Sequence, residues 1–126
     1  MKRAIRLGDL QLAIMRHLWR LEEASVNDVH RGLYEERGLA PTTIATMLRK
    51  MEEKGVVTHR TEGRKFIYRP TVTEKRARRS MVEQLTDRLF SGNVAELVSH
   101  LLEEHEVDEV ELRQLQQLIE EKGKEE

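Results

Sequence analysis

Residues 41–55 constrain the fold of this chain more than any other stretch, because they mark both ends of a helix. Pro41 suits a first helical turn, where its missing N–H costs no hydrogen bond, and Gly55 supplies the left-handed residue that ends a helix. Between them, apolar residues follow the i, i+3, i+4, i+7 spacing of a buried stripe: Ile44, Met47, Leu48 and Met51. The segment is therefore predicted to form an amphipathic helix.

The opposite face of this helix contains no carboxylate. It carries hydroxyls and cations, namely Thr43, Thr46, Arg49, Lys50 and Lys54. Short hydroxyls can approach phosphates or base edges closely, and long cationic side chains can donate to guanine in a major groove. We interpret the segment as a recognition helix for DNA. An ordinary amphipathic helix with a solvated basic face is the alternative on this stretch alone.

The residues after the helix predict a β-hairpin. Segments 56–60 and 66–70 have strand propensity, and a charged turn at 61–65 separates them. Arg64 and Lys65 lie beside Gly63 at the predicted tip, where a wing would touch the DNA backbone. A helix followed by such a hairpin is the core of a winged helix-turn-helix, although a bland hairpin could carry the same charges for solubility.

Two further helices are predicted before the recognition helix. Residues 8–21 repeat apolar positions at helical spacing, and a second helix runs to Arg37 before Gly38. Ser25 and Asp28 have the spacing of a capping box at the start of that second helix. The front of the chain should thus be a compact unit of three helices and a hairpin.

The net charge of −1 conceals a division along the chain. Residues 1–79 hold 18 Lys and Arg against 10 Asp and Glu, a balance of +8, whereas residues 80–126 hold 4 against 13, a balance of −9. This division suits a DNA-binding module joined to an interaction module that avoids DNA. The alternative is two oppositely charged parts that attract each other.

The acidic part is predicted to form helices over 74–90, over 94–104 and from Asp108 onward. These short helices carry more apolar surface than they can bury alone, so we expect them to pack against a second copy of the chain. The residues expected in this homodimer interface are Met81, Leu85, Leu89, Leu97, Leu101, Leu115 and Leu118. The predicted fold is mainly α with a small β-hairpin, with a winged-helix DNA-binding domain at 1–72 and a helical dimerisation region at 73–126.

Several classes of function have no support in the sequence. The chain has no cysteine, which excludes disulfides, thiolate zinc sites and cysteine catalysis. No apolar run approaches the roughly 20 residues of a membrane span, so a cytoplasmic protein without membrane contact is expected. The five histidines are scattered and no phosphate loop or catalytic triad accompanies them, so we expect neither an enzyme nor a metal or cofactor site.

Five motifs occur in order along the chain: residues 7–19, 26–29 and 42–55, Tyr68-Arg-Pro70, and Leu89-Phe-Ser-Gly92. Together they closely resemble the penicillinase-repressor family, which includes the BlaI, MecI and CopY transcriptional repressors. The resemblance implies a homodimeric winged-helix repressor held together by its C-terminal helices. It also implies a palindromic double-stranded DNA operator, often with TACA/TGTA half-sites.

The resemblance also assigns residues. It places the base-reading helix on Thr42, Thr43, Thr46, Arg49 and Lys50 and the wing on Arg64 and Lys65. Members of the family that respond to β-lactams are inactivated by a regulatory protease at an Asn-Phe bond, and the matching position here is His100-Leu101. A cut within residues 91–107 would still uncouple the two parts. A winged-helix module that contacts another protein, with no specific operator, is the rival function.

Overall fold

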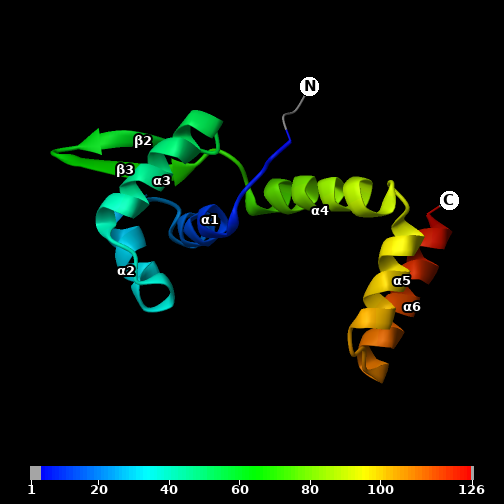
Figure 1. Ribbon diagram of the computed structural model, residues 1–126. Coiled ribbons are helices and arrows are strands. Elements are labelled where there is room, and N and C mark those ends of the chain that lie inside the picture. The colour runs from blue at the N-terminus through cyan, green and yellow to red at the C-terminus, as the bar shows by residue number, and fades with distance from the viewer. Residues whose placement is uncertain (1–3, 126) are drawn as a thin grey trace. The chain divides into compact units, whose positions relative to one another are not determined.

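The computed structural model describes residues 4–125 and contains the predicted helices and hairpin (Figure 1). The elements are α1 (Asp9–Leu21), β1 (Ala24–Ser25), α2 (Val26–Arg37), α3 (Pro41–Lys54), β2 (Val57–Glu62), β3 (Lys65–Pro70), α4 (Glu74–Phe90), α5 (Val94–Glu104) and α6 (Glu109–Lys124). The predicted fold class, mainly α with a small antiparallel sheet, is confirmed. No helix within residues 4–125 is long and apolar enough to cross a membrane.

Contacts divide the chain into two units between Gln84 and Leu85. Helix α4 therefore begins in the first unit and ends in the second. We predicted a different division, between a DNA-binding domain at 1–72 and a dimerisation region at 73–126. That division is one of function and stays a prediction.

The core of the first unit comes from one face of each of its first three helices. Ile44, Leu48 and Met51 of α3 are fully buried, and Met47 is partly buried against the same core. They pack with buried residues of α1 and α2, which include Ile14, Met15, Leu18, Val29 and Leu33. The predicted apolar stripe of α3 is confirmed, and its burial fixes which face of α3 is left to solvent.

The sheet has three strands in the order β1-β3-β2, all antiparallel. In the hairpin, Glu62 pairs with Lys65, so the strands extend further into the predicted turn than expected and only Gly63 and Arg64 lie between them. The sequence gives no indication of β1, in which Ala24 pairs with Tyr68 and Ser25 with Ile67. A strand of two residues is too short to show alternation, and its partner lies more than forty residues away.

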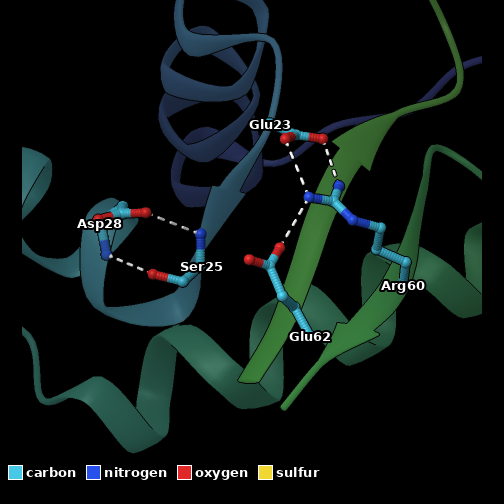
Figure 2. A network of polar contacts seen from close by, with 5 residues as sticks. All are labelled: Glu23, Ser25, Asp28, Arg60 and Glu62. Carbon is cyan, nitrogen blue, oxygen red and sulfur yellow. Dashed lines mark hydrogen bonds and ion pairs between the residues drawn. The ribbon is translucent and has the colours of Figure 1, made fainter. Parts of the chain in front are cut away.

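The predicted capping box at the start of α2 is confirmed (Figure 2). The Ser25 amide donates to Asp28 Oδ2 at 3.0 Å, and the Asp28 amide donates to Ser25 Oγ at 3.2 Å. Hydrogen bonding of its carboxylate to the Ser25 amide, and to a lesser extent to the Ser25 side chain and Arg31, holds the pKa of Asp28 below its ordinary value. Because this pKa is lower in the folded chain, the box stabilises the fold above the ordinary aspartate pKa, and that contribution is lost as the pH falls through the lowered value.

Ser25→Ala is expected to lower the free energy of unfolding by about 1 kcal/mol, because it removes the acceptor of the Asp28 amide. Urea denaturation followed by circular dichroism measures this loss. Asn27→Ala is the matched control, since Asn27 is exposed on the same helical turn. Equal stability of the two variants would contradict a stabilising role for the box.

The chain before α1 lies against α4 within the first unit. The Ile5 amide donates to Ser80 Oγ at 2.8 Å, and Gln84 Nε2 donates to the Ile5 carbonyl at 2.7 Å. Trp19 Nε1 donates to the Val72 carbonyl at 2.9 Å, which holds the link before α4 against α1. The first turns of α4 are thus fixed to the winged-helix core.

The second unit contains the end of α4 with α5 and α6. Asn93 Oδ1 caps α5 by accepting from the Glu96 amide, and Asp108 Oδ1 caps α6 by accepting from the Glu111 amide. Neither α5 nor α6 contains a buried residue in the single chain. The helices are therefore well capped but leave much of their apolar surface in solvent.

Candidate nucleic-acid interface

The predicted reading face of α3 is exposed along its length. Thr42, Thr43, Thr46, Arg49 and Lys50 are all exposed to solvent. Thr46 Oγ1 donates to the Thr42 carbonyl at 2.9 Å, which fixes the hydroxyl orientation and leaves its lone pairs free to accept. Within residues 4–125, no hydrogen bond or ion pair occupies the side chain of Arg49 or Lys50. These two cations are available to a partner.

Lys54 differs from the other cations of α3. Its ammonium donates to the Arg6 carbonyl at 3.0 Å and to Gln11 Oε1 at 2.8 Å. The sequence pattern grouped Lys54 with the solvent-facing cations. The structure shows that Lys54 also joins the end of α3 to Arg6 in the segment before α1 and to Gln11 in α1.

The wing carries two kinds of cation. Arg64 and Lys65 at the tip are exposed, and their side chains have no hydrogen bond or ion pair in the part of the chain that the structure describes. Arg60 lies on β2, further from the tip. Its guanidinium contacts Glu23 through both terminal nitrogens and donates to Glu62 at 2.9 Å (Figure 2). The tip therefore offers positive charge that no group within residues 4–125 engages.

An aromatic and polar cluster joins the wing to α3. His59 Nδ1 of β2 donates to the Glu52 carboxylate of α3, at 2.7 and 2.9 Å from its two oxygens. The His59 ring stacks on Phe66 of β3 with a centroid distance of 4.2 Å and an interplanar angle of 21°. Burial, and to a lesser extent the Glu52 charge, raises the pKa of the neighbouring Tyr68, which stays a neutral phenol. The cluster fixes the wing relative to the reading face.

Sequence reasoning missed Glu52 and His59 as positioning residues. They lie seven positions apart in different elements, and no local pattern links a carboxylate near a helix end to a histidine in the next strand. His59 lies opposite Tyr68 in the hairpin and is therefore a diagonal neighbour of Phe66. This contact can be expected only after the pairing register of the two strands is known.

The seven residues predicted for the dimer interface are placed on the last three helices. Met81, Leu97 and Leu115 are half-buried in the single chain, and Leu85, Leu89, Leu101 and Leu118 are exposed. Leu89 is 70% exposed and Leu118 is 60% exposed. Within residues 4–125, no three His, Asp or Glu side chains form an arrangement that could hold a metal ion.

Comparison with known proteins gives consistent results. Residues 7–121 match the family model described as penicillinase repressor. The chain is 29% identical over 121 residues to the penicillinase repressor of Bacillus licheniformis, covering 96% of this chain and 94% of that protein. It is 34% identical over 113 residues to the transcriptional regulator BlaI of Mycobacterium tuberculosis, covering 88% of this chain and 82% of that protein.

A solved structure matches part of the chain. The solution structure of the monomeric form of Bacillus licheniformis BlaI, in complex with the blaP half-operator, superposes with a TM-score of 0.51. The two sequences are 33% identical, and the match covers 60% of this chain and 92% of that chain. The matched portion has the size of the winged-helix unit described above.

Proposed function

Because this chain belongs to the penicillinase repressor family, we propose that it is a transcriptional repressor that binds a palindromic double-stranded DNA operator as a homodimer. The observation that carries the proposal is the set of exposed hydroxyls and unpaired cations on α3, held at a fixed position relative to the wing tip. Thr42, Thr43, Thr46, Arg49 and Lys50 would contact bases, and Arg64 and Lys65 would contact the backbone.

The last three helices support the proposed homodimer. Their exposed leucines would be buried against the same residues of a second chain, as a two-fold interface requires. Such a dimer presents two α3 helices about 34 Å apart, so that each reads half of a palindrome on one face of the duplex. Bound over a promoter, it would exclude RNA polymerase.

Footprinting of the purified protein on genomic DNA, including the region upstream of its own gene, tests the function directly. We expect a protected palindrome at near-physiological salt. Protection nowhere by a confirmed dimer would favour the rival function, a winged-helix module that contacts another protein.

Salt dependence separates these two functions further. Operator affinity is expected to fall steeply as salt rises, because each neutralised phosphate adds about 0.9 to the slope of log affinity against log salt. Fluorescence anisotropy with a labelled operator, between roughly 50 and 200 mM salt, measures this slope. A slope near zero would argue against phosphate contacts, since contact with an apolar protein surface depends little on salt.

Release of the operator would follow loss of the dimer, because a single winged helix makes few contacts. A regulatory protease acting within residues 91–107 would cut α6, with some or all of α5, away from the reading helix. Ser91 and Gly92, with φ of 50° and 79°, form the break between α4 and α5 in this stretch. A chain truncated after Asn93 should lose operator affinity, and unchanged binding by it would reject this route of release.

A further inference from the structure

An open pocket of about 530 Å³ lies at the end of α3, where the chain before α1 and the start of α4 meet it. Every charged side chain that lines it is a cation: Arg6, Lys54 and Arg76. Its apolar lining comes from Ile5, Val56 and Val72, which are buried in the core. The pocket therefore has a firm apolar base and a uniformly positive rim.

The walls of this cationic pocket are held by hydrogen bonds. Thr71 Oγ1 donates to the Gly55 carbonyl at 2.6 Å, and the Thr71 amide donates to the Val56 carbonyl at 2.9 Å. Lys54 reaches the Arg6 carbonyl across the opening, and this bond together with the one to Gln11 uses two of the three donors of its ammonium. The backbone walls of the pocket and the Lys54 ammonium are thus fixed before any ligand binds.

The charges of this pocket are not accounted for by the fold alone. Arg76 lies in the first turn of α4, where the positive end of the helix dipole disfavours a cation. The side chains of Arg6 and Arg76 have no hydrogen bond or ion pair with any residue from 4 to 125. An anion from outside the chain would offset the repulsion between these unpaired cations.

Helical geometry places this anion beside the reading face. Lys54 follows Thr43 by eleven residues, and at about 100° per residue the two side chains point within roughly 20° of each other around α3. Met47 of the buried stripe lies equally close to Lys54 in angle, so the pocket lies at the edge of the reading face, beyond its C-terminal end. When the reading face lies in a major groove, the next negative group in that direction is a backbone phosphate, which favours DNA over a free small anion.

We propose that the pocket of Arg6, Lys54 and Arg76 binds a phosphate of the operator backbone and forms a third DNA contact besides α3 and the wing tip. This inference rests on the proposed function. Because phosphates carry no sequence information, the pocket contributes equally to operator and unrelated DNA. It also couples the start of α4 to the DNA, since Arg76 belongs to that helix.

Arg76→Gln tests the proposal, with Arg78→Gln as the matched control on the same helix. Arg78 does not line the pocket, is 69% exposed and lies 3.9 Å from Glu74. Anisotropy with operator and unrelated duplexes should show that Arg76→Gln weakens binding to both by the same factor, about 3- to 10-fold, and lowers the salt slope by about 1. Arg78→Gln should stay within about twofold of the unsubstituted chain on both duplexes.

Several results would overturn the proposal. Unchanged affinity and slope for both Arg76→Gln and Arg6→Gln, in a chain that binds operator, would reject the pocket and leave the proposed function intact. A loss confined to the operator would mean that Arg76 reads a base. Amide shifts at Thr71 and Val72 on adding inorganic phosphate, without any change in DNA binding, would assign the pocket to a small anion. An unsubstituted chain that binds no DNA would overturn both proposals.

Discussion

Leu118→Glu is expected to convert the protein from dimer to monomer and to weaken operator binding by about 100-fold or more at near-physiological salt. Leu118 is 60% exposed on α6 and belongs to the face that we propose is buried between two chains. A carboxylate on that face would have to be buried without a partner at the interface, which costs more than an ordinary apolar contact supplies. Without the dimer, each winged helix binds its half-site alone and the gain from linking two sites is lost.

Multi-angle light scattering gives the mass of Leu118→Glu, and anisotropy gives its affinity for the operator. Gln116→Glu is the matched control, because it adds the same charge to the same helix at an exposed position about 200° around from Leu118. The control should remain dimeric and bind as the unsubstituted chain does. If Leu118→Glu remains dimeric, the dimer interface does not include this face of α6. If it is monomeric but binds the operator with full affinity, dimerisation is not needed for operator binding.

The helices of this protein were predictable because their limits are set locally. Pro41 and Gly55 mark α3, Ser25 and Asp28 mark α2, and Asn93 and Asp108 cap the two helices of the second unit. Each signal lies within a few residues of the boundary that it sets, so no tertiary information is needed. The apolar spacing then indicates which face each helix buries.

The parts of the fold that could not be predicted depend on partners distant in sequence. Strand β1 exists because Ala24 meets Tyr68, and nothing near residue 24 indicates that pairing. The contact of Glu52 with His59, which fixes the wing on α3, likewise requires the hairpin to be folded back first. Such contacts follow from the packing of whole elements, and the spacing of residues does not encode them.

The candidate site shows the same limit. Periodicity correctly places Arg49, Lys50 and Lys54 on the solvent side of α3, but it cannot tell a free cation from an engaged one. In the structure, Lys54 forms hydrogen bonds with Arg6 and Gln11. The side chains of Arg49 and Lys50 form no hydrogen bond or ion pair within residues 4–125. That difference selects the residues whose replacement should affect DNA binding without affecting the fold.

Arg49→Ala and Lys50→Ala are each expected to weaken operator binding by about 1 to 3 kcal/mol if the residue makes a specific base contact. Both side chains are exposed and unpaired in the part of the chain described, and alanine is the best helix former, so the stability of α3 should not fall. The loss should therefore appear in DNA binding and not in the urea unfolding midpoint. Anisotropy with the protected palindrome measures the binding change.

The comparison of two duplexes decides what these cations do. A base contact requires that each substitution weaken operator binding much more than binding to unrelated DNA, whereas a phosphate contact weakens both alike. Arg16→Ala, at an exposed position of α1, corrects for the loss of one positive charge and should change neither affinity by more than about twofold. If Arg49→Ala and Lys50→Ala match Arg16→Ala on both duplexes, α3 does not read DNA through this face. Equal losses on both duplexes would instead reassign the two cations to the backbone and leave base reading to the threonines of α3.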